Sequence, residues 1–131
     1  MYIRFVTGQF DRESGLEKGF FQAAFEYWRS EEPTQDWLKA EVRRCLDWFV
    51  EHLEEPERFD PTSRKRRGHW GVCWFRPEAK RHLEEAHHMA WLLKEAGIPV
   101  RMLRARNPGE IVWQDKHQIV AIKNRTGPVY L

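Results

Sequence analysis

The residues best placed to do chemistry form a polar tetrad near the end of the chain, Asp115-Lys116-His117-Gln118. Strands predicted over 110–113 and 118–122 flank it, so the tetrad falls at a strand-to-strand connection. A carboxylate there has two interpretations. Asp is common in turns because its side chain accepts a hydrogen bond from the backbone two residues on. It can also stabilise positive charge that develops in a reaction. Spacing alone favours the turn.

A run of four cations, Arg64-Lys65-Arg66-Arg67, is followed by Gly68-His69-Trp70. The cations could contact phosphates and Trp70 could stack on a base, as in single-strand binding proteins. No second basic stripe lies near this run, so a solvated loop is the better interpretation. We therefore expect no direct nucleic-acid binding.

A cluster of histidines and glutamates lies in a predicted helix at 77–96 and contains two Glu-x-x-His pairs, Glu84–His87 and Glu85–His88. This spacing occurs in carboxylate-bridged metal sites, which need matching ligands on other helices. The acidic second helix offers His52, with Glu51, Glu54 and Glu55. A solvated face with ion pairs explains the cluster more simply, so we expect no metal.

Common catalytic motifs are missing from the sequence. There is no phosphate-binding glycine loop, no G-x-S-x-G elbow and no H-E-x-x-H helix. Cys73 lies four residues after His69, but its apolar surroundings indicate a packed thiol. Nucleophilic hydrolysis is therefore not predicted.

Charge is distributed unevenly along the 131 residues, although the net charge is only +2. Residues 31–60 carry ten acidic and four basic side chains, for a net −6, and residues 61–131 sum to +8. The basic half could attract a phosphate-bearing cofactor. The acidic segment could instead imitate DNA phosphates, which predicts a non-enzymatic inhibitor or protein-binding module as the alternative function.

Composition indicates a single globular domain over 1–131, with 41% hydrophobic and 32% charged residues. No apolar run is long enough to span a membrane, and no secretory signal opens the chain. Two cysteines cannot build a disulfide scaffold. We therefore expect a cytoplasmic protein.

Hydrophobic periodicity predicts a strand over 2–7 ending at Gly8, helices over 14–32 and 34–53, a strand over 72–75, and a helix from Pro77 to Gly97. Strands over 100–105, 110–113, 118–122 and 129–131 complete the chain. The fold class is α+β, with about three helices and a mostly antiparallel sheet. Four of the seven tryptophans lie on or beside the helical apolar stripes and are expected to pack between helices and sheet: Trp28, Trp37, Trp48 and Trp91.

The run from Pro108 to Ala121 has the pattern PG-x-I-V-[YW]-x-D-x-x-Q-x-V-A. With the 72–75 strand and the helix after it, this run resembles a family of small phage and bacterial proteins. The family includes type I-F anti-CRISPR proteins that act as ADP-ribosyltransferases. The resemblance implies a compact ADP-ribosyltransferase-like fold and NAD as the substrate. It also implies transfer of ADP-ribose to a subunit of the CRISPR surveillance complex, or to another host protein, so that recognition of target DNA is blocked.

In that family's chemistry the nicotinamide–ribose bond breaks with oxocarbenium character, which a carboxylate stabilises. The resemblance therefore implies Asp115 as the catalytic acid, although better-known members have Glu there. Arg4 on the first strand would bind the ribose or a phosphate, and is equally well read as a surface cation. The remaining NAD contacts implied are Thr7, Gly8, Phe20, Trp74, Phe75, Trp113 and Gln118, with Phe21 a further aromatic candidate. The Ser-Thr-Ser and Glu-x-Glu motifs of arginine-modifying transferases are missing.

Overall fold

The computed structural model describes residues 1–11, 16–31, 35–54, 72–122 and 129–130. Their elements are, in chain order, β1 (Tyr2–Asp11), β2 (Leu16–Gly19), α1 (Phe20–Arg29), α2 (Asp36–His52), β3 (Val72–Phe75), α3 (Lys80–Glu95), β4 (Arg101–Asn107), β5 (Glu110–Gln114), β6 (Gln118–Ile122) and β7 (Val129–Tyr130).

The strands form one sheet in the order β5-β6-β3-β1-β4-β7, and β2 pairs with β1 beside this path. Every pairing is antiparallel. The predicted α+β class, with three helices and an antiparallel sheet, is confirmed. None of the helices in the described parts of the chain is long and apolar enough to cross a membrane.

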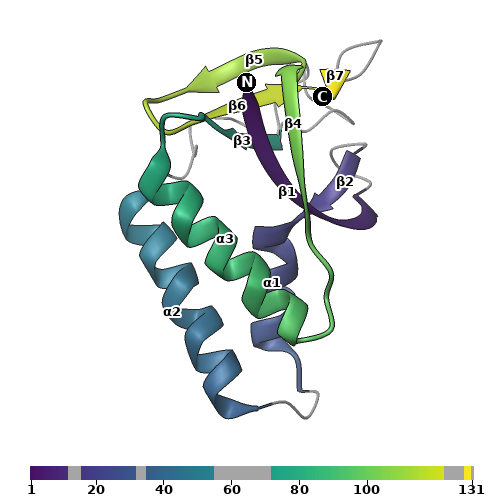
Figure 1. Cartoon of the computed structure of the whole chain (residues 1–131), viewed down its shortest axis with the longest axis vertical. Helices are drawn as coiled ribbons and strands as arrows, with labels where there is room; N and C mark the ends of the chain where they lie inside the picture. Colours follow the sequence, from purple (N-terminus) through teal and green to yellow (C-terminus); the bar gives the residue numbers. More distant parts are fainter. Residues whose placement is uncertain (12–15, 32–34, 55–71, 123–128, 131) are drawn as a thin grey trace.

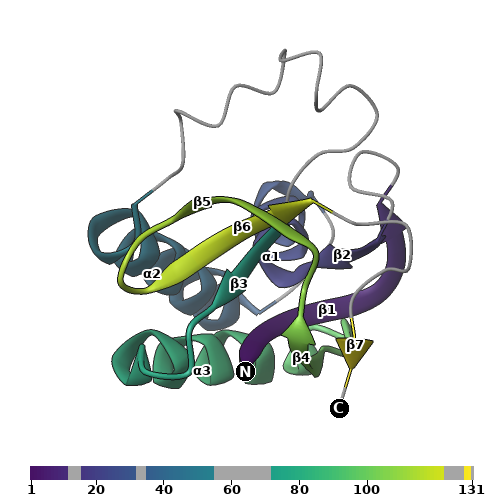
Figure 2. The same ribbon diagram turned by 90° about the horizontal axis from the view of Figure 1, so that it is seen from above.

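The three helices cover one face of the sheet (Figures 1 and 2). Their apolar stripes meet Phe5 of β1 and Phe75 of β3 in the larger of two hydrophobic cores. α2 contributes Leu38, Val42, Cys45, Leu46 and Phe49, the stripe that the sequence predicts. Burial of these side chains against the sheet, rather than helix propensity, holds the helices in place.

A second, smaller core lies on the opposite face of the sheet and exists because the sheet bends. β5, β6 and β3 run across the view of Figure 1, whereas β1 and β4 run down it. The two halves meet where β1 and β3 pair, and Ile3–Phe75 is the one register pair between them. The concave side is filled by Val6, Leu103 and Ala105 from one half and Val72, Trp74, Ile119 and Ala121 from the other.

The predicted first helix begins too early. Leu16–Gly19 forms β2 and pairs with the end of β1, and α1 begins only at Phe20. β1 itself continues past Gly8, which has a φ of 85° where the register between Val6 and Phe10 shifts. Glycine adopts this left-handed conformation without a Cβ penalty, so the strand bulges instead of ending.

The ends of the other helices also differ from the prediction. Gln35 precedes α2 as its N-cap, and Thr34, the predicted cap, lies outside the described residues. Pro77 lies in a turn, in which Ala79 N–H donates to the Arg76 carbonyl at 3.1 Å, and α3 begins at Lys80. Gly97 does end α3 as expected, with a φ of 84°.

Two of the four helical tryptophans do not pack against the sheet. Trp28 and Trp48 pack on the larger core. Trp37 and Trp91, however, are half exposed, and their rings lie 6.4 Å apart between α2 and α3. Their positions lie beside the apolar stripes rather than on them, which is why periodicity alone misplaces them.

Candidate functional site

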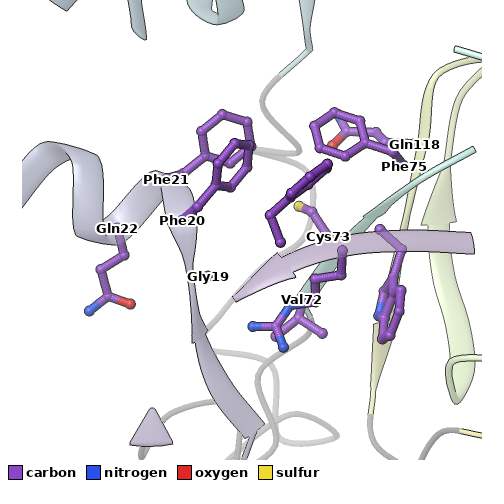
Figure 3. Close-up of a pocket in the computed structure, with 11 residues that line it drawn as sticks. Gly19, Phe20, Phe21, Gln22, Val72, Cys73, Phe75 and Gln118 are labelled. Carbon is purple, nitrogen blue, oxygen red and sulfur yellow. The ribbon is translucent and has the colours of Figure 1, made fainter. Parts of the chain in front are cut away.

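A cavity of about 270 Å³ opens where β1 and β3 diverge beyond their single register pair. We call it the aromatic cavity. Figure 3 shows Phe20 and Phe21, at the start of α1, on one side and Cys73, Phe75 and Gln118 on the other. The described residues that line it are Arg4, Phe5, Gly19, Phe20, Phe21, Gln22, Val72, Cys73, Trp74, Phe75 and Gln118.

Arg4 brings a cation into this largely apolar lining. Its position on β1 pairs with Leu103 of β4, and its side chain is 5% exposed. The guanidinium Nη2 donates to the Glu17 carbonyl of β2. The surface-cation interpretation of Arg4 is therefore wrong, because the side chain is buried beside a cavity. A buried guanidinium is always charged and offers several donors in one plane, which suits phosphate and ribose oxygens.

Aromatic rings give the cavity a rigid wall. Phe20 and Phe21 lie 4.4 Å apart between ring centroids, and Phe5 lies 5.1 Å from Phe20. Phe75 lies 6.2 Å from Phe21 with its ring tilted. The sequence places two adjacent phenylalanines at the first turn of α1, where both line the cavity and Phe20 also belongs to the larger core. Such a wall favours a flat ring as the ligand.

A second cavity, of about 250 Å³, adjoins the first and shares Phe21, Cys73 and Gln118 with it. The rest of its lining comes mostly from α1 and α2: Phe25, Leu46, Phe49, Val50, Leu53 and Glu54. The shared residues make the two cavities neighbours. A ligand with two connected parts can therefore occupy both.

A third cavity, of about 550 Å³, shares Val50, Leu53 and Glu54 with the second. Its other lining residues are polar: Glu51, His52, Asp115, Lys116 and His117. Asp115 therefore does not line the aromatic cavity. It lies instead at the far end of a run of three adjoining cavities that begins at Arg4.

Gln118 links the cavities structurally. It is 1% exposed, and its side-chain amide donates to the Glu54 carbonyl at 2.6 Å. Its backbone N–H donates to Asp115 Oδ1 at 2.9 Å, and its carbonyl accepts from Asp115 N–H. The end of α2 and the β5–β6 connection are thereby held in a fixed relation.

The carboxylate of Asp115 organises the β5–β6 turn. Oδ1 accepts the backbone N–H of His117 at 2.7 Å as well as that of Gln118. The turn interpretation of this residue is confirmed. Among the described residues, Oδ2 accepts no hydrogen bond, so one oxygen holds the turn while the other is available to a ligand. The Asp115 carbonyl accepts from Arg76 Nε at 2.7 Å, which ties the turn to the end of β3.

Two histidines stack beside this turn. The rings of His82 on α3 and His117 lie 4.1 Å apart, and His82 Nε2 lies 2.6 Å from the His52 carbonyl. Burial lowers the pKa of His117, and the neighbouring His82 lowers it further. His117 therefore tends to be neutral and to offer one donor and one acceptor at the third cavity.

Three predicted NAD contacts lie away from the aromatic cavity. Thr7 donates its hydroxyl to the Lys18 carbonyl at 3.4 Å, within the β1–β2 pairing. Gly8 lies in the bulge of β1. Trp113 is partly buried on β5 and lines none of the three cavities. Arg4, Phe20, Trp74, Phe75 and Gln118, by contrast, are brought together.

Sequence reasoning missed Cys73 as a cavity residue. The prediction of a packed thiol is wrong, because Cys73 is exposed and borders both the aromatic and the second cavity. The signal was present in the alternation of β3: Val72 and Trp74 are buried on one face, so Cys73 must face the other way.

Charge on α2 is more balanced than the acidic segment 31–60 as a whole. The helix carries four acidic and three basic residues. Arg43 pairs with Asp47 at 3.2 Å, and Arg44 pairs with Glu41. This part of the segment is not a row of unpaired carboxylates. The basic run 64–67 and Trp70 lie outside the described residues.

No protein-family model matches the chain, and neither a curated protein nor a solved structure is found to resemble it. What the protein does must therefore be inferred from its cavities and from the motif in its sequence.

Proposed function

We propose that the protein is an NAD-dependent mono-ADP-ribosyltransferase that modifies a protein in the bacterial cytoplasm. The acceptor implied by the sequence motif is a subunit of the type I-F CRISPR surveillance complex. One observation carries the proposal. Of the eight NAD contacts expected from the sequence, five line a single cavity although they come from β1, α1, β3 and β6: Arg4, Phe20, Trp74, Phe75 and Gln118.

The shape of the cavities suits a dinucleotide. Each of the first two is slightly smaller than the usual pocket for a drug-sized ligand, which is roughly 300–1,000 Å³, but they adjoin each other. The adenosine diphosphate end would occupy the aromatic cavity, with Arg4 facing a phosphate. The nicotinamide would then lie against Phe21 in the second cavity.

In this orientation the nicotinamide end of the ligand lies in the second cavity, which adjoins the third, so Asp115 would approach the nicotinamide–ribose bond from the third cavity. When the bond between the ribose carbon and the nicotinamide nitrogen breaks, its electron pair leaves with nicotinamide, and positive charge develops on the ribose. A carboxylate nearby stabilises that charge. The acceptor's nucleophile then attacks the same carbon and loses its proton. Asp115 Oδ1 continues to accept the two backbone hydrogen bonds of the turn, so Oδ2 would be the oxygen that faces the ribose.

NAD binding can be tested at the junction of the two cavities. Cys73→Trp would fill the shared space from an exposed position, without altering either core. We expect NAD to raise the melting temperature of the wild-type protein and of the matched Cys73→Ser variant, but not that of Cys73→Trp. Equal shifts in all three proteins, or none in the wild type, would place NAD elsewhere or exclude it.

Transfer can be tested separately with Asp115→Asn. The amide oxygen can still accept the two backbone hydrogen bonds, but the charge is lost. With labelled NAD and the purified surveillance complex, we expect label on a subunit and about a 100-fold slower transfer by the variant. Undiminished transfer would exclude Asp115 as the catalytic acid. Inhibition of the complex without NAD would favour the non-enzymatic binder.

A further inference from the structure

Four metal-ligating side chains converge between α2 and α3, on the helical layer rather than at the cavities. α2 contributes Glu41 and Cys45, which are four residues apart, and α3 contributes Glu85 and His88, which are three apart. Both spacings place the two side chains on one face of a helix. The partners on α2 are therefore Glu41 and Cys45 rather than the residues at 51–55 expected from the sequence.

The distances are close to those of a coordination sphere. Cys45 Sγ lies 3.3 Å from Glu85 Oε1, and His88 Nε2 lies 3.2 Å from Glu41 Oε1. The ligand atoms of Glu41, Cys45 and His88 all lie within 4.8 Å of one another. Bonds of about 2.0–2.3 Å to a tetrahedral zinc ion separate neighbouring ligand atoms by roughly 3.3–3.8 Å. Small rotamer changes would close the difference.

The guanidinium of Arg44 occupies the space between these side chains and places a positive charge there. Its Nη2 donates to Glu85 Oε1 at 2.7 Å and lies 3.4 Å from Cys45 Sγ, while its Nε donates to Glu41. Two carboxylates and a thiol thus surround a positive charge. The Arg44 side chain is 48% exposed, so it can turn outward into water without unpacking the helices.

The thiol would be the group most changed by a metal. Cys45 is fully buried, and its Sγ lies between the guanidinium of Arg44 and the carboxylate of Glu85. The Cys45 thiol donates to Glu85, and it would lose its proton to solvent when a divalent cation replaces the Arg44 guanidinium. Glu41 and His88 are partly exposed and offer the route of entry.

We propose that Glu41, Cys45, Glu85 and His88 form a Zn²⁺ site, which Arg44 closes in the structure described here. One thiolate, one imidazole and two carboxylates suit zinc better than the harder cations Mg²⁺ and Ca²⁺. On binding, Zn²⁺ gains a bond to Cys45 Sγ, the thiol proton leaves to solvent, and Arg44 is released from its two carboxylates. The metal would then join α2 to α3 at the half-exposed pair Trp37 and Trp91.

The test is a titration of the reduced, chelator-treated protein with Zn²⁺ by calorimetry, and with Co²⁺ by absorbance. We expect one ion per chain and a cobalt–thiolate charge-transfer band. Loss of one of four ligands should weaken binding at least about 100-fold. His88→Ala provides this test at a partly exposed position, where folding is not at risk, and Cys45→Ala should in addition abolish the charge-transfer band.

Two matched controls come from this chain. Glu84 and His87 repeat the Glu-x-x-His spacing one residue earlier on α3, but His87 packs on Phe5 at 5.1 Å between ring centroids. Cys73, on β3, is the other cysteine of the chain and lies outside the cluster. His87→Ala and Cys73→Ser should bind Zn²⁺ as the wild type does. Equal weakening by His87→Ala and His88→Ala would overturn the site, as would binding of no ion.

The Arg44→Gln variant should strengthen Zn²⁺ binding, whereas the ligand variants His88→Ala and Cys45→Ala should weaken it. Because it removes the competing cation and leaves two carboxylates facing each other, it should tighten Zn²⁺ binding about 10-fold or more. An ion-pair network without a metal function predicts no Zn²⁺ binding by either protein. Weaker binding by Arg44→Gln than by the wild type would also overturn the proposal.

Discussion

At the scale of single residues, Asp115 has a structural role that is independent of any reaction. Its Oδ1 closes the β5–β6 turn by accepting two backbone N–H groups. The β5–β6 turn also places Gln118 where it lines both the aromatic cavity and the second cavity. A variant that loses activity at position 115 can therefore do so by losing the turn, and the two effects must be measured apart.

Asp115→Ala should lower the free energy of unfolding by about 1–2 kcal/mol, because two backbone donors lose their acceptor. Asp115→Asn keeps an acceptor oxygen at the same place and should lower it by less than about 0.5 kcal/mol. Urea unfolding followed by tryptophan fluorescence measures both. Equal destabilisation by the two variants would show that the charge, rather than the hydrogen bonds, holds the turn.

The sequence reaches some of these residues and not others, for physical reasons. The turn at Asp115 follows from local chemistry, since its partners are two and three residues away. Arg4, Phe20 and Phe75 were named through resemblance, but their meeting depends on how β1 and β3 diverge. Glu85, which accepts a hydrogen bond from the Cys45 thiol, lies 40 residues along the chain and on another helix. No local pattern reports such a contact.

At the scale of elements, the β5–β6 connection is joined to the helical layer by a column of rings. Trp48 and His52 of α2 stack at 4.4 Å, Trp48 meets His82 of α3 at 5.1 Å, and His82 stacks on His117. Arg81 lies 5.0 Å over Trp48. A positive charge on His117 would be repelled by His82 and Lys116 and attracted by Asp115.

This column predicts a loss of stability in mild acid. Burial lowers the pKa of folded His117 below the unfolded value of 6.5. Between those two values the unfolded chain binds more protons, so the free energy of unfolding falls as the pH falls through this window. Above it, His117 contributes no pH dependence. Urea titrations between about pH 8 and about pH 5.5 should show a shallower decline in His117→Gln than in the wild type.

The matched control is His87→Gln, an exposed histidine on α3 that lies outside the column. It should keep the wild-type decline. A His117→Gln protein that declines as steeply as the wild type would assign the acid sensitivity to another group. The effect of Glu85 on the free energy of unfolding falls in a different pH range from that of His117. Hydrogen bonds from Arg44 and Cys45 outweigh the effect of burial and lower the pKa of Glu85. Its contribution to stability is therefore lost only below about pH 4.5.

Helices and strands are predicted well from the sequence where one face is continuously apolar, as in α2 and β3. They are predicted poorly where pairing with another strand determines the conformation. Leu16–Gly19 continues the periodicity of α1, yet it forms β2 because β1 runs past Gly8 and offers an edge to pair with. The choice between helix and strand was made by pairing with residues of β1 from Val6 to Asp11, a contact that the periodicity of 16–19 does not contain.

At the scale of the whole molecule, β1 is the element on which both cores depend. It pairs with β4 at five successive positions from Tyr2 to Val6, and it also pairs with β2 and β3. Phe5 enters the larger core and Val6 the smaller one, at 2% and 0% exposed. The bend that creates the aromatic cavity is therefore made by the most enclosed strand, while β5 forms one edge of the sheet.

Amide hydrogen exchange should consequently be slowest in β1. Opening the amides of 4–6 breaks their pairing with β4 and exposes both cores, so it should require the full free energy of unfolding and should depend on denaturant as global unfolding does. The amides of β5 have a neighbour on one side only and should exchange through smaller openings. If β1 instead exchanged as fast as β5, without denaturant dependence, the junction with β3 would be a hinge. The aromatic cavity would then open by local motion rather than being built into a rigid sheet.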